Sequence, residues 1–329
     1  MADIALTENI AVISRAKVVH RFGARDARFR GLTGLAALFV VLIFTGVIVS
    51  LLDGAMPAIQ KFGFNFLTSD AWNAVTENYG ALASIYGTVL TSLLAMLIAV
   101  PVGIGVAIFL TEICPRSLRR PIGIAIELLA GIPSIIYGIW GLFVFAPEFQ
   151  QTLEPWLIAI LGKIPGLESF FAGPPYGIGI FTAALILSIM ILPFIAAVTR
   201  DVFETVPPML KEAAYGLGCT TWEVMWRVVL PFSRAGVVGG AMLALGRALG
   251  ETMAVTFVIG NAHHIQGSLF APGTTISATI ANEFSEATTE MYQSAIIELG
   301  LILFFITFVV LASAQLMLRT MERRSGGAS

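Results

Sequence analysis

Charged residues are scarce in this 329-residue chain, and their scarcity excludes most soluble proteins. Asp, Glu, Lys and Arg make up 12% of the sequence, against roughly 25% in an average soluble protein, while apolar residues make up 57%. A net charge of −2 offers no basic surface for nucleic acid. Two cysteines are too few for a disulfide-stabilised scaffold. The composition is that of a polytopic membrane protein.

Long apolar runs supply the membrane-crossing segments. A bilayer core about 30 Å thick needs about 20 apolar residues in a helix. Six stretches meet that length: Leu32–Leu52, Ser84–Thr111, Pro121–Ala146, Ile178–Thr199, Gly236–Gly260 and Ser294–Leu318. We therefore expect an all-α fold, with a six-helix transmembrane domain at residues 32–318 between tails at residues 1–31 and 319–329. The apolar patch Trp156–Leu161 is too short to span, so we expect a surface or re-entrant element there.

The distribution of lysine and arginine predicts the orientation. Sixteen of the 19 basic residues fall in the two tails and in the loops that follow the second and fourth spans. The opposite loops hold only Lys61 and Lys163, and Arg247 lies inside a span. Because cytoplasmic loops carry the excess of positive charge, both termini are expected in the cytoplasm.

The loop at residues 201–231 shows a pattern of two short helices. Pro207–Pro208 suits the start of a helix, while Gly216 and Gly218 suit an end in the left-handed conformation. Thr220 and Glu223 have the spacing of a capping box for a second helix.

Small side chains mark the first of these helices. We expect Ala213 and Ala214 to be exposed, because small residues allow a partner to approach closely, and Pro231 to end the second helix. An ordinary amphipathic loop packed on the membrane surface would give the same composition, so the residues by themselves leave both interpretations open.

Fixed residues at fixed spacing in this loop resemble the EAA motif of importer-type ABC permeases. The matching positions are Glu212, Ala213, Ala214, Gly218, Leu230 and Pro231, and the one departure is Val228 in place of isoleucine. The resemblance implies the type I ABC importer fold, with Lys211–Gly218 as a coupling helix docked in a groove of a cytoplasmic ATPase subunit.

No nucleotide-binding loop accompanies this motif. The sequence lacks G-x-x-x-x-G-K-[ST], the pattern that cradles ATP phosphates. We therefore expect a transporter subunit that is not itself an enzyme and holds no cofactor, with ATP–Mg bound by the partner ATPase.

Two charged residues interrupt the fifth apolar stretch. Arg247 lies roughly 16 Å along a helix that starts at Gly236, which is near the bilayer midplane. Glu251 follows four residues later, on the same helical face one turn away. A self-neutralising ion pair that fixes helix packing is one interpretation. The other is that Arg247 faces the translocation path, where its planar guanidinium matches the oxygens of an anion.

Glu251 bears on which anion would pass. A carboxylate beside the path repels a fully deprotonated oxyanion such as sulfate. Hydrogen phosphate still carries a proton and can donate a hydrogen bond to that carboxylate. The segment Leu245–Val255 resembles the same span in phosphate ABC permeases, as does Gly131–Gly138 in the third span. Together with the long N-terminal tail, these segments resemble the PstC type of subunit more than the PstA type.

The third span carries further candidate residues. Pro133, flanked by Gly131 and Ser134, is expected to kink the span beside the path. Glu127 is expected to pair with Arg119 or Arg120 near the membrane surface.

The resemblance also implies partners. They are a homologous PstA-like permease, two PstB-like ATPase subunits and an external PstS-like phosphate-binding protein that docks on the outer loops. An ABC permease for molybdate or sulfate, or an ATP-independent anion channel or carrier, remains an alternative; the EAA motif disfavours the channel and the carrier.

Overall fold

The structure is a computed structural model that describes residues 2–166 and 168–326, with side chains for residues 26–166 and 168–320. The chain divides into two units, Met1–Asp53 and Gly54–Ser329. The first unit is helical throughout its described residues and belongs to α1 (Ala2–Phe62), which extends into the second unit. Residues 2–31 of the predicted tail therefore have a helical backbone, but the side chains of residues 1–25 lie outside the described set.

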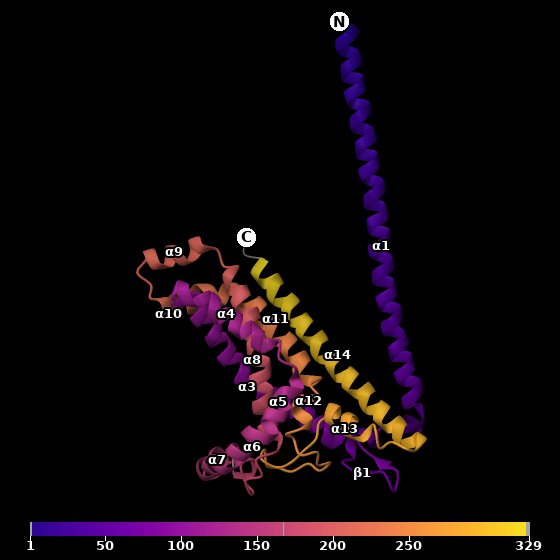
Figure 1. The fold of residues 1–329 in the computed structure, drawn as a ribbon, viewed down its shortest axis with the longest axis vertical. Helices are drawn as coiled ribbons and strands as arrows, with labels where there is room; N and C mark the ends of the chain where they lie inside the picture. Colours follow the sequence, from indigo (N-terminus) through magenta and orange to yellow (C-terminus); the bar gives the residue numbers. More distant parts are fainter. Residues whose placement is uncertain (1, 167, 327–329) are drawn as a thin grey trace. The chain divides into compact units, whose positions relative to one another are not determined.

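The second unit contains the remaining elements (Figure 1). In chain order they are α2 (Asn65–Thr68), β1 (Trp72–Asn73), β2 (Asn78–Tyr79), α3 (Leu82–Ile108), η1 (Phe109–Ile113), α4 (Arg116–Ala130), α5 (Ser134–Trp140), η2 (Gly141–Phe145), α6 (Ala146–Gln151), α7 (Leu153–Leu161), η3 (Glu168–Phe170), α8 (Ile180–Glu204), α9 (Pro208–Gly216), α10 (Thr221–Val224), η4 (Met225–Val229), α11 (Leu230–Leu249), α12 (Met253–Thr256), α13 (Ile276–Glu283) and α14 (Glu290–Gly326). Strands β1 and β2 form a small antiparallel hairpin.

The helical, polytopic class predicted from the sequence is confirmed. Within the described residues, five helices are long and apolar enough to cross a membrane: Asp26–Phe62, Leu82–Ile113, Ile180–Glu204, Thr221–Leu249 and Glu290–Thr320. A sixth candidate span consists of two helices, Arg116–Ala130 and Ser134–Gln151, bent by 86° at the break between them. The predicted third span, Pro121–Ala146, is therefore two separate helices rather than one kinked helix.

The fifth span also differs from its prediction. The sequence suggested Gly236–Gly260, but the helix starts earlier and ends at Leu249, in the middle of the apolar run. Hydropathy does not register this break because the residues that form it are flanked by apolar residues on both sides.

Helix α8 lies at the centre of the second unit and packs on α3 and α11 through small residues. A Cβ on Gly103 of α3 would lie 2.7 Å from Ile195 of α8. On α11, a Cβ at Gly236 would lie 2.6 Å from Val202, and one at Gly240 would lie 2.7 Å from Val198. Small residues let helix backbones approach closely where no hydrophobic force drives helices together. These contacts fix an antiparallel register between α8 and α11.

The two ends of this unit carry different elements (Figure 1). Helices α9 and α10 lie at one end, with the start of α4, while α7, α13 and the β1–β2 hairpin lie at the other. At the hairpin end, Trp72 stacks on His263 with ring centroids 5.2 Å apart. Nearby, the Tyr292 hydroxyl donates a hydrogen bond to Glu283.

Candidate functional site

The loop at residues 201–231 has the predicted helix–turn–helix form. Helix α9 ends at Gly216, and Gly218 adopts φ of +85°, the left-handed conformation that favours glycine. The backbone N–H of Cys219 returns to the Ala214 carbonyl at 3.2 Å and closes the turn. The turn therefore depends on Gly218.

The second helix of the loop begins with the predicted capping box. The Glu223 N–H donates to the Thr220 hydroxyl at 3.3 Å, and the Thr220 N–H donates to the Glu223 carboxylate at 2.9 Å. This reciprocal pair satisfies donors that the first turn of α10 leaves free.

Two details of the loop correct the sequence prediction. Ala213 is exposed, but Ala214 is only 8% exposed and packs with Phe203 and Val224, so the helix presents one small residue rather than two. Pro231 does not end the second helix: it lies in the first turn of α11, after the π-helical turn η4. Proline has no N–H to donate to the carbonyl four residues earlier in a helix. The π-helical turn, which is wider than an α-helical turn, lies where that hydrogen bond is missing.

An ion pair that the sequence did not indicate holds α9 in place. Lys211 Nζ lies 2.5 Å from Glu112 Oε1, and both side chains are largely buried. Glu112 belongs to η1, which continues α3, so the pair joins the loop to a membrane-crossing helix. The signal available in the sequence was a lone carboxylate at the start of an otherwise basic loop.

Exposed apolar side chains accompany this loop. Met209 is 79% exposed, Leu217 86% and Trp222 68%, all on or beside α9 and α10. Apolar residues this exposed at the tip of a loop leave an unpartnered surface.

The predicted pair of charged residues occupies a helix end rather than a continuous helix. Arg247 lies in the last turn of α11, and its side chain is exposed. Glu251 follows the end of the helix, and its Oε1 accepts from the N–H of Ala254 at 3.3 Å, at the start of α12. The prediction that the two share one helical face was wrong, and no ion pair joins them within the described residues. Each instead lies at the helix end whose dipole suits its charge.

Arg247 nevertheless lies level with the middle of a membrane-crossing helix. The register of Gly236 with Val202 and of Gly240 with Val198 advances four residues on each helix. Continued at the same rate, it places Arg247 opposite Ile191, near the middle of α8. The helix therefore ends at mid-span, where a guanidinium facing lipid would cost about 2.5–3.5 kcal/mol on insertion scales.

The predicted kink in the third span is a complete break. Gly131 terminates α4, Pro133 precedes α5, and Ser134 is the first residue of α5. The Tyr137 hydroxyl donates to the carbonyl of Leu129 at 2.9 Å, across the break. It satisfies an acceptor that the end of α4 leaves without a helical partner.

The two breaks lie at one level because α5 packs on α12. A Cβ on Gly138 would lie 2.8 Å from the Met253 carbonyl oxygen and 3.1 Å from the Ala254 Cα. A Cβ on Gly141 would lie 3.0 Å from Val258, so the two segments run in parallel. Extended backward, this register places the start of α5 beside the end of α11. The structure thus places the two predicted groups at the same level along the membrane-crossing helices.

Comparison with known proteins identifies the family. Residues 99–325 match the family described as binding-protein-dependent transport system inner membrane component. The chain belongs to this family.

Close relatives exist among curated members. A protein of Mesorhizobium japonicum, named phosphate transport system permease protein PstC, is 64% identical over 313 residues, which cover 95% of this chain and 96% of the relative. The protein of the same name from Pasteurella multocida is 58% identical over 91% of this chain and 93% of its own length.

Solved structures of ABC transporters share the fold. The chain resembles a component of a bacterial alginate ABC transporter with a TM-score of 0.61 and 19% identity, over 90% of this chain and 97% of the other. At that identity the likeness concerns the fold, and it confirms the prediction of an importer-permease fold for this family member.

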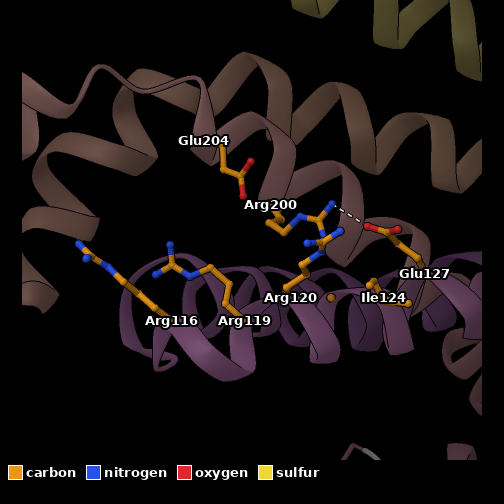
Figure 2. A pocket seen from close by; sticks show the side chains of 8 residues that line it. Arg116, Arg119, Arg120, Ile124, Glu127, Arg200 and Glu204 are labelled. Carbon is orange, nitrogen blue, oxygen red and sulfur yellow. Dashed lines mark hydrogen bonds and ion pairs between the residues drawn. The ribbon is translucent and has the colours of Figure 1, made fainter.

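Glu127 pairs differently from the prediction. Its carboxylate lies 2.8 Å from Arg200 Nη2 of α8, rather than near Arg119 or Arg120 of its own helix. Arg200 Nη2 also lies 2.8 Å from Asp201. The pair joins α4 to α8 beside a pocket lined with arginines (Figure 2).

Proposed function

We propose that the chain is a transmembrane permease subunit of an ATP-driven inorganic phosphate importer. The observation that carries this proposal is the identity of 64% to a phosphate transport system permease protein, over nearly the full length of both chains. The geometry agrees with it at two places, the break at mid-span and the loop at residues 201–231.

The break at mid-span supports an anion path. Arg247 is exposed on the surface of this chain at a depth where lipid contact is costly. A second permease subunit packed on this face would exclude lipid and enclose the guanidinium beside a water-filled path. Glu251, whose carboxylate caps α12, would accept a hydrogen bond from hydrogen phosphate and disfavour sulfate. The breaks at Pro133 and Gly250 leave polar backbone groups there, as is tolerated where a segment lines a cavity.

The loop at residues 201–231 supports coupling to ATP. Helix α9 presents Ala213 and exposed apolar side chains, and Lys211 ties it to α3 through Glu112. A partner ATPase that binds ATP–Mg would move α9, and the ion pair would transmit that motion to the membrane-crossing helices. The partners we propose are a homologous PstA-like permease, two PstB-like ATPase subunits and a PstS-like external binding protein, in the inner membrane with both termini in the cytoplasm.

Transport in reconstituted vesicles tests this proposal. The permease would be reconstituted with its homologous partner, the ATPase subunits inside and the binding protein outside. We expect uptake of labelled phosphate that requires ATP and persists in a hundredfold excess of sulfate. Uptake without ATP would support a channel or carrier instead, and competition by sulfate or molybdate would support a permease for another oxyanion.

A further inference from the structure

A pocket of about 280 Å³ opens between the start of α4 and the end of α8 (Figure 2). Figure 2 shows arginines extending from α4 toward α8, and Glu204 extending from α8 toward α4. The charged residues that line the pocket are Arg116, Arg119, Arg120, Arg200, Glu127 and Glu204. None of these residues belongs to the proposed phosphate path or to the coupling helix.

Three of the arginines crowd one face of α4. Arg119 and Arg120 follow Arg116 by three and four residues, so each is a neighbour of Arg116 on the helix surface, where like charges repel. They also lie in the first turns of α4, where the helix dipole favours negative charge. Within the part of the chain that the structure describes, Arg116 and Arg120 form no ion pair.

The carboxylates nearby do not balance these charges. Glu127 and Asp201 both pair with Arg200, which leaves Glu204 as the one lining carboxylate for the three arginines of α4. Arg200 itself lies close over α4, because a Cβ on Gly123 would be 2.9 Å from its Nη1. The pocket therefore has an excess of guanidinium groups with an open volume between them.

We propose that this pocket binds a phosphate-type oxyanion. Guanidinium groups offer paired N–H donors whose geometry matches the oxygens of a phosphate group. Such a group reaches the pocket from two sources, inorganic phosphate in solution or the headgroup of an anionic phospholipid. The inference rests on the proposed function in two respects. The proposed topology places the opening of the pocket on the cytoplasmic side, and the proposed import supplies phosphate to that side.

The pocket is connected to the coupling helix by two routes. Helix α8 ends at Glu204, and α9 begins at Pro208, four residues later. Arg119 donates to the carbonyl of Thr111, and the next residue, Glu112, holds Lys211 of α9. An anion that attracts Arg119 into the pocket acts on the same backbone that positions α9.

Direct binding measurements test this site. The full-length chain would be delipidated in maltoside, and binding of labelled inorganic phosphate would be measured by equilibrium dialysis, with and without added phosphatidylglycerol. The test variant is Arg116→Gln with Arg120→Gln. The charge-matched control is Arg30→Gln with Arg319→Gln, which removes two exposed arginines outside the pocket. A third variant, Arg247→Gln, reports binding in the proposed path.

The outcomes separate the sources and the two proposals. Phosphate binding weakened roughly 10- to 100-fold in the pocket variant, but unchanged in the control, supports the site with free phosphate as its ligand. If the wild type retains phosphatidylglycerol and the pocket variant loses it, the result supports the site with a lipid headgroup as its ligand. If neither ligand distinguishes the pocket variant from its control, the inference is overturned, and phosphate binding lost only in Arg247→Gln would leave the proposed function intact. Arg116→Gln alone repeats the test should the double variant be poorly produced.

Discussion

Single residues at helix ends carry most of the proposed mechanism. Arg247 and Glu251 are four residues apart, but the end of α11 at Leu249 separates them into two different environments. Arg247 is left exposed at mid-span, where only a partner subunit or a water-filled path can accommodate it. Glu251 caps α12 and keeps an oxygen available for a second hydrogen bond.

The left-handed turn at Gly218 predicts that the loop is sensitive to substitution of this one residue. Gly218→Ala places a Cβ on a residue with φ of +85°, which we expect to destabilise the loop by roughly 1–2 kcal/mol. Gly216→Ala makes the same chemical change two residues earlier, at the end of α9, where a Cβ meets nothing within 4 Å. We expect weaker co-purification of the ATPase with Gly218→Ala than with Gly216→Ala. Equal retention by the two variants would contradict a coupling role for the turn.

His263 predicts a pH dependence at the opposite end of the unit. Burial lowers the pKa of His263, although Glu283 opposes that shift, so the folded state favours the neutral ring stacked on Trp72. The unfolded chain binds a proton at a pKa of about 6.5. Stability from this group is therefore present above about pH 6.5 and is lost as the pH falls below it.

Melting temperatures of the purified protein at pH 7.5 and pH 5.5 measure this effect. We expect His263→Gln to show a smaller loss on acidification than the wild type. His264→Gln, which leaves His263 and its stacking on Trp72 in place, serves as the control. An unchanged pH dependence in His263→Gln would show that this ring does not contribute.

At the scale of elements, the two broken spans could not be predicted from apolar composition. The left-handed turn and the capping box of the loop at residues 201–231 follow from Gly218, Thr220 and Glu223, because each acts on its own neighbours in the sequence. The geometry of the breaks depends on distant contacts instead, such as that of Gly138 with Met253. Gly131 and Pro133 predicted only a kink, and apolar residues continue beyond both breaks.

The ion pairs between helices could not be predicted from the sequence either. Lys211 and Glu112 are 99 positions apart, and Arg200 and Glu127 are 73 apart, so neither pair has a local signature. The sequence placed Glu127 near the arginines of its own helix, whereas packing of α4 on α8 supplied a different partner.

The contact of α5 with α12 predicts the effect of one added methyl group. Gly138→Ala would place a Cβ 2.8 Å from the Met253 carbonyl oxygen, and we expect it to cost about 1–3 kcal/mol and to reduce uptake. Gly105→Ala is the control, since a Cβ there meets nothing within 4 Å. Thermal stability and phosphate uptake of both variants check the prediction. Normal uptake by Gly138→Ala would mean that the alignment of the two breaks is not required.

At the scale of the whole molecule, the proposed function requires the two ends of the second unit to face opposite sides of the membrane. Helices α9 and α10 lie at one end, and the β1–β2 hairpin lies at the other (Figure 1). The arginine pocket belongs to the first end, because the start of α4 and the end of α8 line it. In the topology we propose, the first end faces the cytoplasm, because basic residues are in excess there. Phosphate captured outside would then enter near the hairpin, and ATP would act at α9.

Thiol labelling in sealed cells checks this orientation. In a chain whose native cysteines are replaced, Val75→Cys and Ser285→Cys should react with an impermeant reagent from outside, because both positions are exposed at the hairpin end. Cys219, retained alone, should react only after the cells are opened. Labelling of Cys219 in sealed cells would reverse the topology.

The most direct test of the account is phosphate uptake by Arg247→Lys. The lysine keeps the positive charge at mid-span but loses the planar fork that holds two oxygens at once. Uptake would be measured in the reconstituted vesicles and normalised to the amount of assembled complex, with Arg319→Lys as the control at an exposed position. We predict normal assembly and uptake reduced roughly 10- to 150-fold, the loss of a charge-assisted hydrogen bond. Uptake by Arg247→Lys equal to that of the control would contradict contact between Arg247 and the anion.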